Sequence, residues 1–297
     1  MKAAVVFTAA LLALAGAASA HASAIIDRNA QHVRLAVDGN GQALITYEAH
    51  GQLMHVRAWG AINARQPTSA VAQVRFRKDY SGRSWTSFKN TCRAYDGPKL
   101  AFQVAACAAS DGSYWALQSW RRTLPNFDGR THSGLGNWEL HLSHWSGSIA
   151  TLEAWTDWVY GGRYHHLFGR LTYDGKPVYG FSATRVGSPT DGYGRNIYVD
   201  TFDSRYGKGW RRENAFLAHR PTGVFCYGFY RFSSRGPGNG SKYRLNAIGP
   251  GVTPDVSITV PGLHDFDRNN PADVAYEQKQ NALLDSIVGV DKKCRVH

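Results

Sequence analysis

The carboxylates best placed for chemistry lie on a predicted hairpin, residues 138–160, with its turn at 146–148. Period-two alternation along two paired strands gathers alternate side chains on one face. In this register His141 faces Glu153. The shared face then carries two tryptophans, one histidine and three carboxylates: Glu139, His141, Ser143, Trp145, Thr151, Glu153, Trp155 and Asp157.

Diagonal positions on such a hairpin, here Glu139 and Glu153, lie about 7–8 Å apart at the backbone. That separation suits the acid and the base of an inverting glycosidase, and the neighbouring indole rings suit stacking on a sugar. The pattern therefore predicts a polysaccharide-active hydrolase that uses Glu139, Glu153 and His141. The simpler interpretation is an ordinary half-exposed sheet, in which His141 and Glu153 form a cross-strand pair without catalysis.

Two glycine-rich segments, 191–195 and 206–212, mix aromatic side chains with arginine. Aromatic residues on such loops suit ligand contact, although loop packing also explains them. The adjacent arginines Arg211 and Arg212 are interpreted as solvated surface charge. Together with the hairpin, these segments predict the ligand-contacting set Trp145, Trp155, Asp157, Tyr193 and Trp210.

Calcium is the cofactor that the sequence pattern suggests most directly. Oxygen-bearing side chains occupy positions 1, 3, 5 and 9 of a calcium-loop spacing: Asp265, Asp267, Asn269 and Asp273. However, Asn270 stands where such loops have glycine, and Tyr276 replaces the bidentate glutamate. Capping of the following helix explains Asn270 and Asp273 without a metal, so no cofactor is required.

Other chemistries have less support. If a leader is cleaved after Ala20, the amine and imidazole of His21 would chelate copper as in lytic polysaccharide monooxygenases, whereas cleavage after Ala24 removes His21. There is no Gly-x-Ser-x-Gly motif, and Ser143 beside His141 lacks a defined oxyanion hole. A secreted nuclease would need a histidine–metal or histidine–glutamate pair that the sequence does not locate.

The four cysteines predict two disulfides, because an even number outside the cytosol indicates pairing. Three connectivities are open. The most economical one joins Cys92 to Cys107 in a short loop and Cys226 to Cys294, which ties the C-terminal tail to a strand. A zinc site built from the four thiolates is the alternative, but no Cys-x-x-Cys pair is present.

The first residues have the three parts of a secretory signal peptide. Lys2 precedes an uncharged apolar stretch, and small residues end it at Ala20 or Ala24. The stretch is shorter than the roughly 20 residues that a membrane span needs, and no later segment qualifies. The sequence therefore predicts a secreted, extracellular protein without a membrane span.

The net charge of +12 points to anionic partners. A basic exported protein tends to meet teichoic acids, acidic polysaccharides, phospholipid head groups or nucleic acid. The charge is dispersed, without a run of five or more like charges. A glycan or an anionic cell-wall polymer is therefore the expected partner, and nucleic acid is not; the oligomeric state is not predicted.

The sequence predicts that short strands separated by turn residues position the candidate site residues. A β-meander is predicted over 33–59 and four consecutive antiparallel strands over 138–184. The expected fold class is all-β, with antiparallel sandwich or meander sheets, one C-terminal helix and two disulfides. The expected division is a signal peptide (1–24), an N-terminal meander region (25–130) and a C-terminal sandwich-like region with the terminal helix (131–297).

The C-terminal helix has clear start and stop signals. Asn270 is a good N-cap, Pro271 suits the first helical position, and Asp273 favours the positive end of the helix dipole. Gly289 ends the helix. An apolar stripe that includes Leu284 and Val288 predicts packing against a sheet.

Four strings, at 107–118, 192–195, 221–226 and 262–267, resemble a group of secreted, β-rich actinobacterial proteins that has no assigned activity. The resemblance runs through most of the mature chain and implies export. Residues 169–180 also resemble the start of a prealbumin-like or immunoglobulin-like extracellular sandwich, which implies fold class only. The expected function is non-catalytic binding of a cell-envelope or extracellular polysaccharide or another anionic polymer, with the secreted glycoside hydrolase as the alternative.

Overall fold

The structure is a computed structural model. It describes residues 24–61, 76–83, 85–121, 136–177, 180–183, 189–191, 196–217, 222–229, 239–248, 253–289 and 294. The predicted leader up to residue 23, with His21, and the predicted ligand residue Tyr193 lie outside the described residues. The described chain is mostly β-strand with one C-terminal helix, which confirms the predicted fold class.

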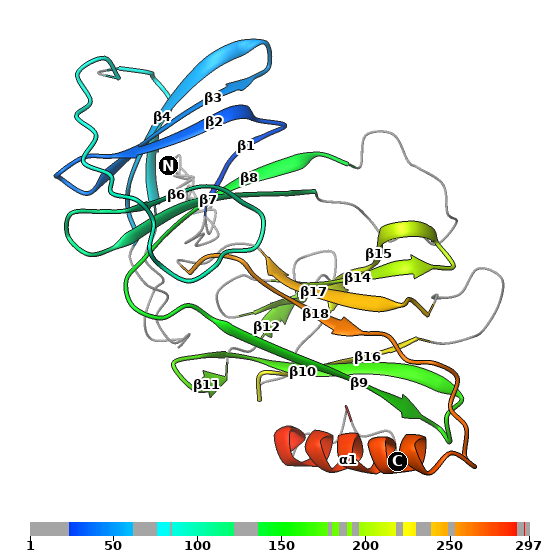
Figure 1. Cartoon of the computed structure of the whole chain (residues 1–297). Coiled ribbons are helices and arrows are strands. Elements are labelled where there is room, and N and C mark those ends of the chain that lie inside the picture. Colours follow the sequence, from blue (N-terminus) through cyan, green and yellow to red (C-terminus); the bar gives the residue numbers. More distant parts are fainter. Residues whose placement is uncertain are drawn as a thin grey trace, which may run out of the picture.

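Most strands form four antiparallel sheets, each named here after one of its strands (Figure 1). The β3 sheet contains β2 (Gln31–Val37), β3 (Gln42–Ala49), β4 (Gln52–Gly60) and β5 (Phe76–Asp79). The β7 sheet contains β1 (Ala24–Arg28), β8 (Trp138–Trp145), β7 (Tyr114–Arg121) and β6 (Gln103–Ala108). The β14 sheet contains β15 (Gly207–Leu217), β14 (Asn196–Ser204), β17 (Lys242–Ile248) and β18 (Val256–Pro261). The β10 sheet contains β9 (Thr151–Val159), β10 (Tyr164–Tyr173), β11 (Lys176–Pro177) and β16 (Val224–Phe229), and a separate ladder pairs β12 (Gly180–Ala183) with β13 (Pro189–Asp191).

The sheets are layered in the order β3, β7, β14 and β10, and helix α1 (Pro271–Val288) covers the outer face of the β10 sheet (Figure 1). Apolar clusters fill the junctions. One core joins the β3 and β7 sheets through residues such as Ile45 and Leu142. Another joins the β14 and β10 sheets through Leu245 and Phe225. The junction between the β7 and β14 sheets is smaller and more polar, with Trp120 against Tyr198.

The predicted N-terminal meander is confirmed. β2, β3 and β4 pair in sequence order as antiparallel neighbours. The Asp38 carboxylate accepts hydrogen bonds from the backbone N–H groups of Asn40 and Gln42, and Gly41 takes a positive φ of 69°. A short polar side chain followed by glycine is the chemistry that a tight turn requires.

The predicted hairpin over 138–160 is wrong. β8 pairs with β7 and β1, whereas β9 pairs with β10, so the two strands lie in different sheets. The segment between them carries the chain from one layer to another, and Ala150 is buried in the core of the next layer. Alternation predicted correctly which side chains share a face of each strand, but it carries no information about the partner strand. The division predicted at residue 131 places β8 with the second region, although β8 pairs with strands of the first.

The helix and both disulfides agree with the sequence prediction. The Asn270 side chain accepts a hydrogen bond from the Ala272 N–H, and Gly289 is the C-cap. The disulfides join Cys92 to Cys107 and Cys226 to Cys294. No helix in the described part of the chain has the length and apolar character needed to cross a membrane.

Candidate functional site

The residues predicted to act as acid and base do not meet. Glu139 is 5% exposed, and its Oε1 lies 3.2 Å from Arg28 Nη2. Glu153, in another sheet, accepts a hydrogen bond from Arg170 Nε. His141 lies 3.4 Å from Glu139 and stacks on Trp120. Each carboxylate is thus neutralised by its own arginine, and the hairpin geometry that suggested an inverting hydrolase is absent.

The predicted ligand residues of the hairpin lie inside the layered fold. Trp145 is fully buried, and Asp157 is equally inaccessible beneath helix α1. Trp155 is partly buried against Phe168 on the same side of the β10 sheet. Both faces of these strands are covered, because each strand belongs to an inner layer. The polar alternation therefore marks internal polar contacts here.

Asp157 forms a buried pair with a histidine that the sequence did not connect to it. Its Oδ1 lies 2.7 Å from His166 Nδ1 on the neighbouring strand. Burial, followed by the charge of Asp157, raises the pKa of the Glu277 carboxyl on helix α1. The pair thus lies at the contact between sheet and helix. His165, next in the chain, points the other way and bonds Tyr243, as strand alternation predicts.

The sequence analysis also did not predict a hydrogen-bonded serine–histidine pair. His144 Nε2 lies 2.9 Å from Ser113 Oγ, and its Nδ1 lies 3.0 Å from the Gly60 carbonyl oxygen. The same serine hydroxyl is 2.6 Å from Asp111 Oδ1 and is almost fully buried. Burial also lowers the pKa of His144. These contacts tie a turn to two sheets and give a substrate no access to the hydroxyl.

Two of the predicted calcium residues, Asp267 and Asp273, accept hydrogen bonds at the start of helix α1. The Asp273 carboxylate accepts hydrogen bonds from Asp267 N and Asn270 Nδ2 and lies 2.9 Å from His264 Nε2. Asp267 Oδ1 in turn accepts a bond from the Asn269 N–H. Among the described residues, no three histidine, cysteine or acidic side chains group as a metal site. Calcium binding by Asp265, Asp267, Asn269 and Asp273 stays an untested prediction.

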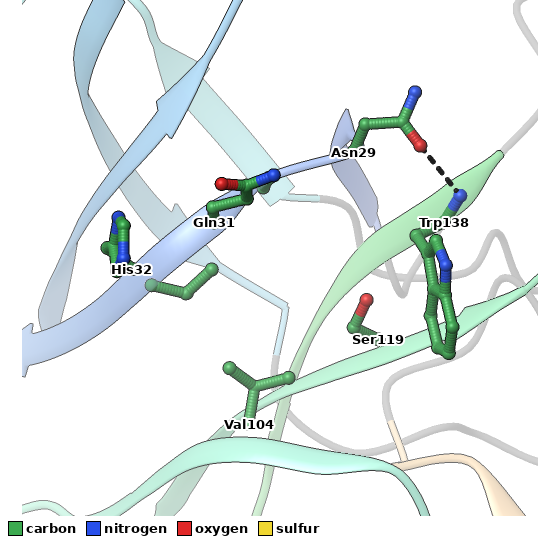
Figure 2. Close-up of a pocket in the computed structure, with 8 residues that line it drawn as sticks. Asn29, Gln31, His32, Val104, Ser119 and Trp138 are labelled. Carbon is green, nitrogen blue, oxygen red and sulfur yellow. Dashed lines mark hydrogen bonds between the residues drawn. The ribbon is translucent and has the colours of Figure 1, made fainter.

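A surface groove with a volume of about 540 Å³ lies at the open end between the β3 and β7 sheets (Figure 2). Its size is within the range of small-ligand sites, roughly 300–1,000 Å³. Trp138 is 49% exposed and Val104 is 43% exposed, so the groove presents apolar surface to solvent. The described residues that line it are Asn29, Ala30, Gln31, His32, Val33, Val104, Ser119 and Trp138.

The groove has a polar rim opposite its aromatic side. Figure 2 shows Gln31 and His32 across from Ser119 and Trp138, with Asn29 beside Trp138. Asn29 Oδ1 accepts a hydrogen bond of 3.0 Å from the Trp138 N–H, and Asn29 N donates back to the Trp138 carbonyl oxygen. These two bonds fix the backbone of the exposed tryptophan to the rim.

The rim also holds unusual backbone geometry. Asn29 and His32 have positive φ angles of 54° and 51°. This region is uncommon for residues with a Cβ, and such conformations cluster at functional sites. The register of β2 against β3 is broken between Gln31 and Arg34, next to the same rim. The chain therefore departs from regular strand geometry where it forms the groove.

Trp210, another of the predicted ligand residues, has an intermediate burial like that of Trp155. It is partly buried on the β14 sheet, with its ring 5.0 Å from Phe202 and 4.3 Å from the Arg244 guanidinium carbon. Arg212, interpreted from sequence as solvated charge, is buried beside it, whereas Arg211 is exposed. The interpretation of Arg212 is therefore corrected.

Comparisons with known proteins provide no information about the function of this chain. No family model, no curated protein and no solved structure was found to match this chain. The resemblance to secreted actinobacterial proteins stays a prediction.

Proposed function

We propose that this chain is a secreted, non-catalytic protein that binds an extracellular polysaccharide in the Trp138 groove. The observation that carries the proposal is a half-exposed tryptophan fixed beside an open groove with a polar rim. No described lining residue is a carboxylate or a cysteine, which favours binding over hydrolysis.

The groove chemistry suits a sugar ring. An indole face stacks well on the apolar C–H face of a pyranose, since aromatic rings combine large apolar area with a negative face. The side chains of Asn29, Gln31 and Ser119 supply donors and acceptors for hydroxyl groups. Because Asn29 holds the Trp138 backbone from both its N–H and its C=O, little backbone freedom is lost on binding.

Export is supported by the two disulfides, and the position of Ala24 bears on where the proposed leader is cleaved. Two disulfides are typical of proteins that mature in an oxidising compartment. Ala24 opens β1, is buried, and pairs with Leu142. Cleavage of the proposed leader after Ala20 would keep this pairing, whereas cleavage after Ala24 would remove its first residue.

The proposal is tested by replacing Trp138 with alanine and measuring retention on insoluble and soluble glycans. Loss of the stacking surface should weaken binding about tenfold, or roughly 1.4 kcal/mol. Trp85→Ala is the matched control, because Trp85 is 47% exposed but stacks on His55, outside the residues that line the groove. The proposal fails if the wild-type protein retains no glycan, or if both variants lose binding equally.

A further inference from the structure

The β14 sheet carries a second cluster, here called the arginine ladder, on the face that meets the β7 sheet. Strand register places its members in two cross-strand rows. The inner row is Arg212, Asp200 and Arg244, and the outer row is Trp210, Phe202 and Lys242. The inner row is mostly buried, whereas Lys242 is exposed, so the ladder runs from the interior to the surface.

One carboxylate serves two guanidinium groups in the inner row. Asp200 is 3% exposed and accepts hydrogen bonds from Arg212 Nε and from Arg244 Nη2, the latter at 3.0 Å. Asn246 Nδ2 donates a third bond to the same carboxylate. Asp200 thus fixes both guanidinium planes, as second-layer carboxylates do at preorganised sites. Two positive charges against one negative leave the inner row with a net charge of +1.

The guanidinium group of Arg212 has one donor nitrogen without an acceptor among the described residues. The residue is 8% exposed, and within the described residues its buried Nη1 atom has no hydrogen-bond acceptor. Two other buried carboxylates are engaged elsewhere: Glu213, next to Arg212 in the sequence, bonds Tyr227, and Asp255 bonds Trp120. An unsatisfied buried donor is costly, more so on a charged group. An anion that enters past the partly exposed Arg244 side chain would satisfy it and neutralise the excess charge.

Aromatic rings lead from this donor to the surface. The Arg212 guanidinium carbon lies 4.6 Å from the Tyr198 ring, and that of Arg244 lies 4.3 Å from the Trp210 ring. Phe202 packs edge-on against Trp210 and lies 5.8 Å from Lys242 Nζ. Such stacking holds a guanidinium flat while leaving its edge for an anion.

We propose that the arginine ladder binds the oxyanion groups of an acidic polysaccharide, separately from the Trp138 groove. Arg212 and Arg244 take one carboxylate, sulfate or phosphate group. Lys242 takes the next charge along the polymer, and Trp210 and Phe202 contact the sugar between them. Three cations beside partly buried rings suit a charged sugar chain better than a nucleic acid strand, which uses open aromatic faces for successive bases.

The test measures binding to neutral dextran, carboxymethyl dextran, dextran sulfate and dextran phosphate, so that the backbone is constant and only the oxyanion changes. The wild-type protein should bind at least one charged dextran more tightly than neutral dextran. Lys242→Gln should weaken that binding about tenfold, while Lys279→Gln, an equal charge change at an exposed site on α1, should not.

A second variant addresses the buried row, where a single substitution could unfold the sheet. Asp200→Asn combined with Arg212→Gln and Arg244→Gln removes all three charges of the inner row together, so no buried charge is left without its partner. This triple variant should remain folded by circular dichroism and should lose preference for the charged dextrans. The proposal is overturned if Lys242→Gln and Lys279→Gln weaken binding equally, or if single-stranded DNA binds more tightly than every charged dextran.

The two sites fail in different ways. If the Trp138 proposal is wrong, Trp138→Ala has no effect on neutral glycans, but the charge preference of the arginine ladder persists. If the ladder proposal is wrong, Lys242→Gln does not reduce binding of the charged dextrans, and this result is independent of the effect of Trp138→Ala on glycan binding.

Discussion

At the scale of single residues, the close packing of the β10 sheet depends on Gly169. This residue lies in the middle of β10, between β9 and β16. A Cβ atom there would stand 2.1 Å from the Glu153 carbonyl oxygen and 2.4 Å from the Phe225 ring. Neither neighbour is the free end of a flexible side chain, because one is backbone and the other is a fully buried ring.

Gly169→Ala should therefore destabilise the protein by about 2–3 kcal/mol, since overpacking a filled core costs this much. Chemical denaturation monitored by tryptophan fluorescence measures the effect. Gly39→Ala is the control, because nothing lies within 4 Å of its added Cβ in the β2–β3 turn. The control should stay within about 0.5 kcal/mol of the wild type; equal effects at both sites would contradict the packing argument.

At the scale of elements, local signals were predictable and pairing was not. The cap residues of α1 act within a few residues of the chain, so Asn270 and Gly289 could be identified from sequence. The face of each strand also followed from alternation, as Leu140 and Leu142 show in the first core. Which strand lies beside β8 depends on contacts far along the chain, and no local signal encodes it.

The start of α1 should respond to acid. A hydrogen bond from the Asp267 N–H, together with the contact to His264, lowers the pKa of Asp273 below its usual 3.8. A lowered folded-state pKa means that the stabilisation is complete above the unfolded value and is lost as pH falls through the folded value. Asp273→Asn should therefore lower the melting temperature at pH 7, and this difference should shrink as pH falls below about 4.

Thermal unfolding of both proteins between pH 7 and pH 3 measures this dependence. Asp96→Asn, at an exposed site away from the helix, is the control and should show no such convergence. A melting-temperature difference that stays constant down to pH 3 would show that Asp273 acts through shape and not through charge.

At the scale of the whole molecule, both candidate sites depend on how distant strands pair and on how the sheets are layered. The groove combines Asn29, Val104 and Trp138, which three separate segments bring together. The arginine ladder combines Arg212 and Arg244 from strands that flank β14. Composition and charge predicted the class of partner that is proposed. The residues themselves could not be predicted, because no spacing along the chain reports which layers meet.

The two disulfides should stabilise different layers by different amounts. Cys226 and Cys294 are 68 residues apart, and Cys92 and Cys107 are 15 apart. In the chain-entropy model these loops contribute about 4 and about 3 kcal/mol. Replacing each pair by serine should reduce the free energy of unfolding in that order, as denaturant titration would measure.

Hydrogen exchange distinguishes the local effects of the two bonds. Cys294 packs in one apolar cluster with Phe168, Leu284 and Val288, so the bond to Cys226 holds the chain beyond α1 against the β10 sheet. Its removal should increase amide exchange in α1, because that packing face loses its covalent tie. Removal of Cys92–Cys107 should leave α1 unchanged and increase exchange in β6. If α1 stays fully protected without Cys226–Cys294, apolar packing alone holds the helix, and the disulfide acts only on the unfolded chain.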